Sequence, residues 1–374
     1  MTAAAARPFT TIIADLDREL AGHPEFGDGL AIERRSLGRL RAGLLMLGRR
    51  VPALAAAAPT IAHDERALLA VLGDPVLRNA FEYDLGHLAR GRPGRATSLA
   101  GFLPTVDLSA HGPCQALAEP PRSAWPADGP AWALTGIDES TGPIAARLWQ
   151  LLRAAFPGPT AVAPITPLDA DLAALRRGAA LLSELLPGVG GTALRHVRMV
   201  GLARDPDSPD GSGGPDGGGP DGGGGPDGAG GPLRATSGDD GLPCAMFIAP
   251  DQLRRPRNTA RLILREGLRL ALCEVVRCRP MVVADPQPVA GVAVPWRTEP
   301  CPVDRALFGL HGYVHLALFR AASSPPRASD LPLSRAGYLA ERLQGSHRHH
   351  LTPYGLAFVH WLADALAVLR HRKR

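Results

Sequence analysis

The segment Asp205–Gly231, DPDSPDGSGGPDGGGPDGGGGPDGAGG, constrains the fold of this chain more than any other feature. Glycine, proline and aspartate make up nearly all of it, and a Gly-Pro-Asp-Gly unit recurs. Such a composition buries too little apolar surface to offset the entropy lost on ordering. We therefore expect residues 205–241 to be a disordered insertion, and we expect the core to come from the sequence on either side.

Short apolar runs bounded by glycine and proline flank this insertion. HVRMVGLAR (His196–Arg204) precedes it and PCAMFIAP (Pro243–Pro250) follows it. Runs of this length and composition are typical of buried strands. The sequence therefore predicts a pair of strands, with the insertion as an expanded hairpin loop. A long loop costs little, because the closure entropy grows only logarithmically with its length.

Elsewhere, apolar residues recur mostly at helical spacing. The pattern breaks at Gly73-Asp74-Pro75, where proline suits the first turn of a new helix. Ser98–Ala110 and Pro130–Gly136 are possible further strands. We predict an α+β fold that is predominantly α-helical, with a small sheet packed on a helix near residues 256–279. A helical N-terminal region, residues 1–125, would precede a second domain, residues 126–374, that contains the insertion.

Composition restricts the classes of partner. The chain has 41 basic and 36 acidic residues, and Lys373 is the only lysine. Without the six aspartates of Asp205–Gly231, 30 acidic residues remain, so the rest of the chain is strongly basic. No basic stretch is interleaved with aromatic residues, so we expect no nucleic-acid partner. There is no signal peptide, no long apolar run and no CxxC pair, which favours a cytoplasmic protein with free cysteines and no membrane partner.

The helix that contains RLILREGLRLALCEVV (Arg261–Val276) combines apolar residues with a regular series of cations. Residues four apart share one face of a helix, so Arg261, Arg265, Arg269, Cys273 and Arg277 form a stripe. One interpretation is an amphipathic helix whose arginine edge faces solvent, with Glu266 paired to Arg269.

The order of three motifs suggests a second interpretation. LILREGLRLALCEVV is followed by VPWRTEPCP and then by RALFGLHGYVHLALF. This series resembles the 2-oxoglutarate-dependent HExxH-type peptide β-hydroxylases that accompany ribosomally made peptide natural products. The resemblance covers roughly residues 142–320. It implies a zincin-like arrangement of sheet and motif helix, a precursor peptide or another peptide-modification enzyme as partner, and Fe(II) with 2-oxoglutarate as cofactors of an active member.

The chain departs from that family at the metal ligands. Arg265 and Arg269 replace the two motif histidines, and a protonated guanidinium has no lone pair for a metal. Glu266 matches the motif's catalytic glutamate, but it loses its role without a metal. His311 matches the histidine of the family's later helix, and His315 lies one turn further on, so these two are the candidate metal ligands.

Without iron, the same positions predict an anion site. Arg265 and Arg269, joined by Trp296 and Arg297 of the Pro-Trp-Arg loop, would bind a carboxylate of a peptide. The favoured hypothesis is a cofactor-free, inactive relative of the hydroxylases that binds a precursor peptide. An active iron oxygenase that uses Glu266, His311 and His315 is the second hypothesis, and an unrelated helical interaction protein is the third.

Overall fold

The computed structural model describes residues 9–106, 122–124, 132–134, 142–155, 163–204, 235–237, 242–284, 291–323 and 331–371. The fold is α+β and predominantly helical, as predicted, with one small sheet. The predicted insertion, residues 205–241, lies outside the described residues except for Ala235–Ser237.

The α-helices, in chain order, are α1 (Phe9–Gly22), α2 (Gly29–Arg50), α3 (Ala57–His63), α4 (Glu65–Leu72), α5 (Pro75–Ala89), α6 (Ser98–Phe102), α8 (Pro143–Ala155), α9 (Asp169–Leu185), α10 (Pro187–His196), α11 (Pro256–Cys278), α12 (Val303–Ser323), α13 (Leu331–Gln344) and α14 (Pro353–His371). Short 3-10 helices are η1 (Pro52–Leu54), η2 (Pro93–Arg95), η3 (Leu103–Thr105), η4 (Pro250–Arg254) and η5 (Arg348–His350). The strands are β1 (Arg122–Ala124), β2 (Trp132–Leu134), β3 (Ala163–Ile165), β4 (Met199–Arg204), β5 (Ala235–Ser237) and β6 (Ala245–Ile248).

The two strands predicted beside the insertion do pair, but the hairpin prediction was wrong. β4 runs parallel to β6, with Met199 opposite Ala245 and Leu202 opposite Ile248. Parallel neighbours cannot be joined by a tight turn and need a long crossover, which residues 205–244 are long enough to supply. The strand that runs antiparallel to β6 is β5. Apolar runs predict strands, but they do not give strand direction.

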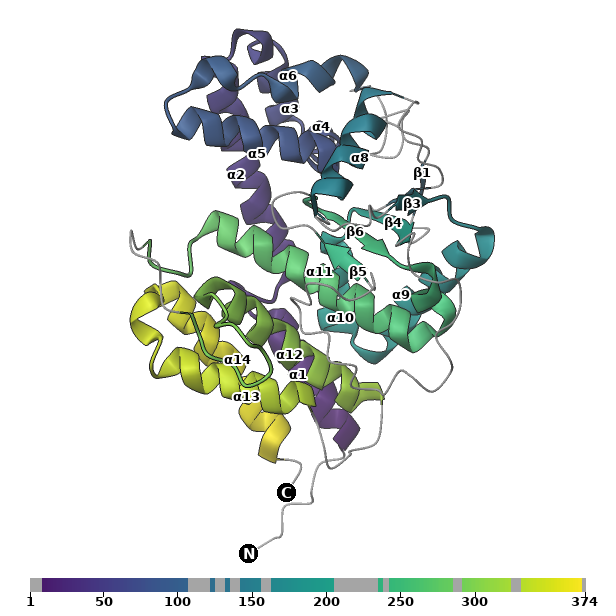
Figure 1. Ribbon diagram of the computed structural model, residues 1–374, viewed down its shortest axis with the longest axis vertical. Coiled ribbons are helices and arrows are strands. Elements are labelled where there is room, and N and C mark those ends of the chain that lie inside the picture. Colours follow the sequence, from purple (N-terminus) through teal and green to yellow (C-terminus); the bar gives the residue numbers. More distant parts are fainter. Residues whose placement is uncertain are drawn as a thin grey trace, which may run out of the picture.

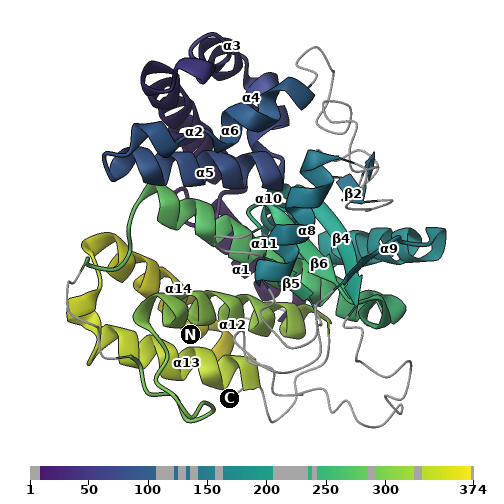
Figure 2. The same cartoon turned by 45° about the horizontal axis from the view of Figure 1, so that its top comes forward.

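The sheet separates two hydrophobic clusters. Met199 and Phe247 point to one face, where they pack with α8 and with helices α2 to α6. Val200 and Met246 point to the other face, where they pack with α9 to α14 and with α1. Alternate residues of a strand face opposite sides, so both faces of β4 and β6 are covered, as is usual for parallel strands. Figure 2 shows α8 on one side of β4 and β6.

The N-terminal helices behave partly as predicted. Asp74 caps α5, since its Oδ1 accepts hydrogen bonds from the amides of Val76 (2.8 Å) and Leu77 (3.1 Å). The predicted strand at Ser98–Ala110 was wrong, because Ser98–Phe102 forms α6; residues 107–110 lie outside the described part. The carboxylate of Asp84, on α5, accepts from the amides of Ser98 (3.1 Å) and Leu99 (2.9 Å), a tertiary helix cap that the local pattern does not reveal.

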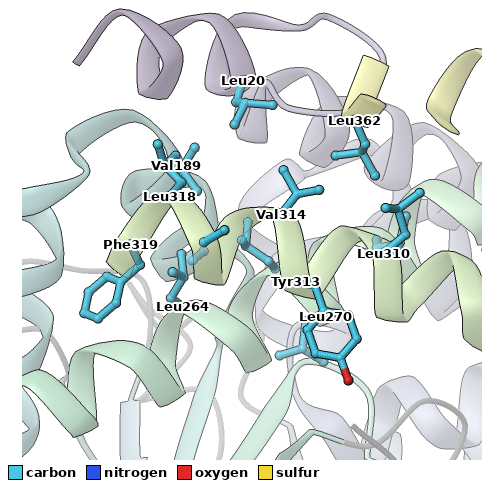
Figure 3. Packing of buried hydrophobic residues seen from close by; sticks show 14 of the residues in the cluster. Leu20, Val189, Leu264, Leu270, Leu310, Tyr313, Val314, Leu318, Phe319 and Leu362 are labelled. Atoms are coloured by element: carbon cyan, nitrogen blue, oxygen red, sulfur yellow. The ribbon is translucent and has the colours of Figure 1, made fainter. Parts of the chain in front are cut away.

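Helix α11 is the central element of the molecule (Figure 1). Helices α2, α9, α10 and α12 all pack against it, and so does β5. Gly267 allows the close approach of α10, since a Cβ at that position would lie 2.4 Å from the backbone oxygen of Ala193. Figure 3 shows α12 between two layers, with Leu264 of α11 on one side and Leu20 and Leu362 of α1 and α14 on the other. The predicted domain boundary at residue 125 stays a prediction.

Candidate functional site

A cleft of about 380 Å³ lies between α11 and α12. Its walls combine charged and apolar side chains. The lining residues are Arg261, Leu262, Arg265, Glu266, Arg269, Cys273, Val276 and Arg277 from α11, and Asp304, Arg305, Phe308, Gly309, His311, Gly312, Tyr313 and Leu316 from α12. Five arginines stand against two carboxylates, a formal excess of three positive charges. Such an excess favours an anionic ligand.

The whole arginine stripe of α11 faces this cleft. Each residue of the stripe follows the previous one by four positions, and all five line the cleft: Arg261, Arg265, Arg269, Cys273 and Arg277. Each of the four arginines is partly buried, so the stripe is not a fully solvated edge. The prediction that these side chains share one surface of the helix is therefore confirmed. Because α12 packs beside α11, this surface forms one wall of a cleft.

Helix α12 runs antiparallel to α11. The Nη2 of Arg257, in the first turn of α11, donates to the Oγ of Ser323 at the end of α12 (2.8 Å). The first turn of α12, with Asp304 and Arg305, therefore lies beside the last turn of α11, with Arg277, and all three residues line the cleft. Arg305 was not singled out from the sequence, because no local pattern links it to an arginine on another helix.

Within the R-E-x-x-R motif, the glutamate is inside the protein and its neighbour neutralises it. Glu266 is 1% exposed, and its carboxylate is paired with the Arg265 guanidinium, whose Nε donates to Oε1 at 2.6 Å. Glu266 therefore orients Arg265 at the cleft wall, and its predicted catalytic role stays a prediction.

His311 and His315 are both buried in α12, but only His311 lines the cleft. Their rings are 4.4 Å apart, and the Nδ1 of His315 lies 2.8 Å from the backbone oxygen of His311. Burial lowers the pKa of His315 to about 4. Burial, with a smaller effect from His315, lowers the pKa of His311 well below its ordinary value. Both imidazoles are thus neutral at pH 7.

The residues of this site do not fit an iron centre. Within the described ranges, no three His, Cys, Asp or Glu side chains come together in a way that could hold a metal ion. At the two positions where the resemblance would place histidine ligands, the chain has Arg265 and Arg269, whose guanidinium groups would repel a cation. Two imidazoles do not complete the shell of a non-haem iron, which uses two histidines and a carboxylate.

The Pro-Trp-Arg loop supports the cleft wall from behind. The Trp296 ring packs edge-on against Tyr313 (6.2 Å between centroids) and Tyr338 (5.5 Å), and the Arg335 guanidinium lies 5.1 Å above it. Tyr313 lines the cleft, whereas Trp296 and Arg297 do not. The Nη1 of Arg297 lies 3.8 Å from the sulfur of Cys301.

A buried ionic network includes Arg277, the last residue of the arginine stripe. The Glu274 carboxylate accepts from the Arg277 Nη1 (3.2 Å), from the Arg78 Nη2 (2.9 and 3.0 Å) and from the Ser36 hydroxyl. Burial alone would raise the pKa of Glu274, but the attraction of Arg78 and Arg277 outweighs it and lowers the pKa far below the usual range. The network joins α11 to α2 and α5.

Comparison with known protein families and with curated proteins gives no match to this chain. The resemblance to the HExxH-type hydroxylases therefore stays a prediction from its three motifs. Among the described residues, no helix is both long enough and apolar enough to cross a membrane.

Proposed function

We propose that the cleft between α11 and α12 binds an acidic peptide, and that the chain acts as a peptide-binding protein without metal-dependent chemistry. One observation supports this above all: Arg261, Arg265, Arg269, Arg277 and Arg305 face one cleft that contains two carboxylates. Planar guanidinium groups pair with carboxylates through two parallel hydrogen bonds, so they suit aspartate and glutamate side chains.

The biological setting follows from the resemblance alone. A degenerate relative of the peptide β-hydroxylases would work beside a precursor peptide of a ribosomal natural product, in the cytoplasm. An active oxygenase would need further metal donors beside His311 and His315, and the described residues bring no such group together. The binding role requires only the arginines that line the cleft.

The energetic scale is moderate. A half-buried arginine–carboxylate pair contributes about 1 kcal/mol, and more where water is excluded. Loss of two such pairs should therefore weaken binding by about 10- to 100-fold. The interaction should also weaken with added salt, because the Debye length falls from about 10 Å at 0.1 M to about 3 Å at 1 M ionic strength.

Fluorescence anisotropy with a fluorescein-labelled peptide rich in aspartate tests the proposal, beside the same peptide with asparagine at each acid. The variant to use is Arg261→Gln with Arg269→Gln, because Arg265 pairs with the buried Glu266 and its loss would disturb the fold. The matched control is Arg176→Gln with Arg177→Gln, which removes two exposed charges from α9 outside the cleft.

We expect the wild type and the α9 control to bind the acidic peptide, the cleft variant to bind it at least tenfold more weakly, and the asparagine peptide not to bind. Equal affinity of the two double variants for the acidic peptide would show that the cleft is not the binding site. Circular dichroism spectra of all three proteins establish that each is folded.

A further inference from the structure

The spacing of the arginines along α11 carries information about the ligand. An α-helix rises about 1.5 Å per residue, so Arg261, Arg265 and Arg269 follow one another at steps of about 6 Å. Cys273 occupies the next step and Arg277 the one after it, and all five side chains line the cleft. The cleft wall therefore presents three cations, one neutral position and a fourth cation at nearly equal intervals.

An extended peptide has a matching repeat. Its backbone rises about 3.3 Å per residue and alternate side chains point the same way, so every second side chain recurs at about 6.6 Å. From the first to the ninth residue, such a peptide spans about 26 Å. From Arg261 to Arg277, sixteen residues further on, the helix spans about 24 Å. The long arginine side chains can absorb a difference of this size.

The cleft has a volume of about 380 Å³, so it accommodates side chains of a bound peptide rather than the whole peptide chain. Helices α11 and α12 pack against each other, and Leu264, Leu270, Leu310 and Val314 belong to one buried cluster (Figure 3). An extended chain can lower alternate side chains into such a space and keep its remaining side chains outside.

We infer that the cleft recognises an extended acidic peptide in a fixed register, with carboxylates at three alternate positions opposite Arg261, Arg265 and Arg269. The next alternate position, opposite Cys273, is not acidic, and the one after it carries a carboxylate opposite Arg277. This inference rests on the proposed function and names the class of peptide. The apolar lining residues Phe308, Tyr313 and Leu316 give the opposite wall a surface for the aliphatic parts of the ligand.

The test compares peptides of one composition. The first has nine residues, with aspartate at the first, third, fifth and ninth positions, valine at the seventh and serine elsewhere. The second places the four aspartates next to one another. Both are made in the two chain directions, because the spacing does not fix polarity. A longer helix-forming peptide with acids four residues apart completes the set. Anisotropy with each labelled peptide gives the dissociation constants.

The alternating peptide, in one direction, should bind at least tenfold more tightly than the contiguous peptide, and aspartate in place of its valine should bring no gain. Replacement of the aspartate at position five by asparagine should weaken binding to the wild type but not to Arg269→Gln. The same replacement should still weaken binding to Arg261→Gln, whose partner is the first aspartate. These double-mutant cycles assign the register residue by residue.

A variant that changes no charge provides an independent check. A Cβ at Gly312 would meet no atom within 4 Å, and Gly312 lines the cleft, so the side chain of Gly312→Leu starts from open space at the cleft wall. It should weaken binding of the alternating peptide at least tenfold and leave the helical circular dichroism unchanged. Unchanged binding to this folded variant would place the peptide elsewhere.

The outcomes separate the two proposals. If the alternating and contiguous peptides bind equally, and Arg261→Gln with Arg269→Gln weakens both equally, the cleft binds anions but the fixed register is refuted. Tighter binding of the helix-forming peptide would also refute the extended register. If no acidic peptide binds the wild type, the proposed function itself is wrong.

Discussion

Replacement by alanine should have opposite effects on stability at two glycines of neighbouring helices. Gly267 and Gly312 are both interior residues of long helices, α11 and α12, where alanine is intrinsically favoured over glycine by about 0.8–1 kcal/mol. A Cβ at Gly312 meets no atom within 4 Å, whereas one at Gly267 would lie 2.4 Å from the Ala193 oxygen and 2.8 Å from its carbonyl carbon. The change to alanine is the same, and only the surroundings differ.

Gly312→Ala should therefore raise the free energy of unfolding by about 0.5–1 kcal/mol. Gly267→Ala gains the same propensity but forces the α10 backbone away, and overpacking of this kind costs about 1–3 kcal/mol. Because the contact is with a backbone and cannot be relieved by a rotamer change, we expect the upper part of that range and a net loss of about 1–2 kcal/mol.

Urea denaturation followed by circular dichroism measures both variants, and their free energies of unfolding should differ by about 2–3 kcal/mol. Differential scanning fluorimetry gives a second measure, with Gly312→Ala melting above the wild type and Gly267→Ala below it. If Gly267→Ala were as stable as Gly312→Ala, the close packing of α10 on the R-E-x-x-R turn would be refuted.

Two further predictions concern buried charge. Arg78→Met leaves the buried Glu274 carboxylate with fewer partners, so it should lower the free energy of unfolding, measured in urea, by about 3–5 kcal/mol. The double variant Arg78→Met with Glu274→Leu should recover most of that loss. A double variant no more stable than Arg78→Met would contradict this account. Burial lowers the pKa of His196 to about 4 in the folded protein, whereas the pKa in the unfolded chain is about 6.5. As the pH drops from about 6.5 towards 4, the unfolded chain therefore takes up a proton that the folded protein does not. The stability of the folded protein falls over that range. From about pH 6.5 to about pH 4, the free energy of unfolding of the wild type should therefore fall by about 1–3 kcal/mol relative to that of His196→Leu. If the difference between the two proteins did not depend on pH, the lowered pKa of His196 would be refuted.

The cleft wall contributed by α11 could be predicted from the sequence, because it depends on one short-range rule. Residues four apart share a helical face, so the stripe from Arg261 to Arg277 followed from spacing alone. The other wall could not be predicted in this way. Arg305 and Asp304 lie opposite the stripe only because α12 folds back antiparallel to α11, and no local pattern encodes which helices pack together.

The errors in the predicted fold have the same origin. The hydrophobic runs at β4 and β6 predicted strands correctly, but strand direction depends on the path of the chain between them. Ser98–Phe102 has a strand-like composition, yet the Asp84 carboxylate from another helix caps it as α6. Trp296 and Arg297 of the Pro-Trp-Arg loop do not line the cleft, and Trp296 packs against Tyr313, so their part in an anion site stays a prediction.

The central claim, that the arginines of α11 bind an acidic ligand, is tested most directly by NMR of the arginine Nε–Hε groups. The alternating aspartate peptide is titrated into the labelled protein, with resonances assigned from single Arg→Gln variants. We predict saturable shifts for Arg261, Arg265, Arg269 and Arg277, and none for the exposed Arg176 and Arg177. Equal shifts at all of these arginines, or shifts at the α9 arginines alone, would contradict the assignment of the cleft as a specific peptide-binding site.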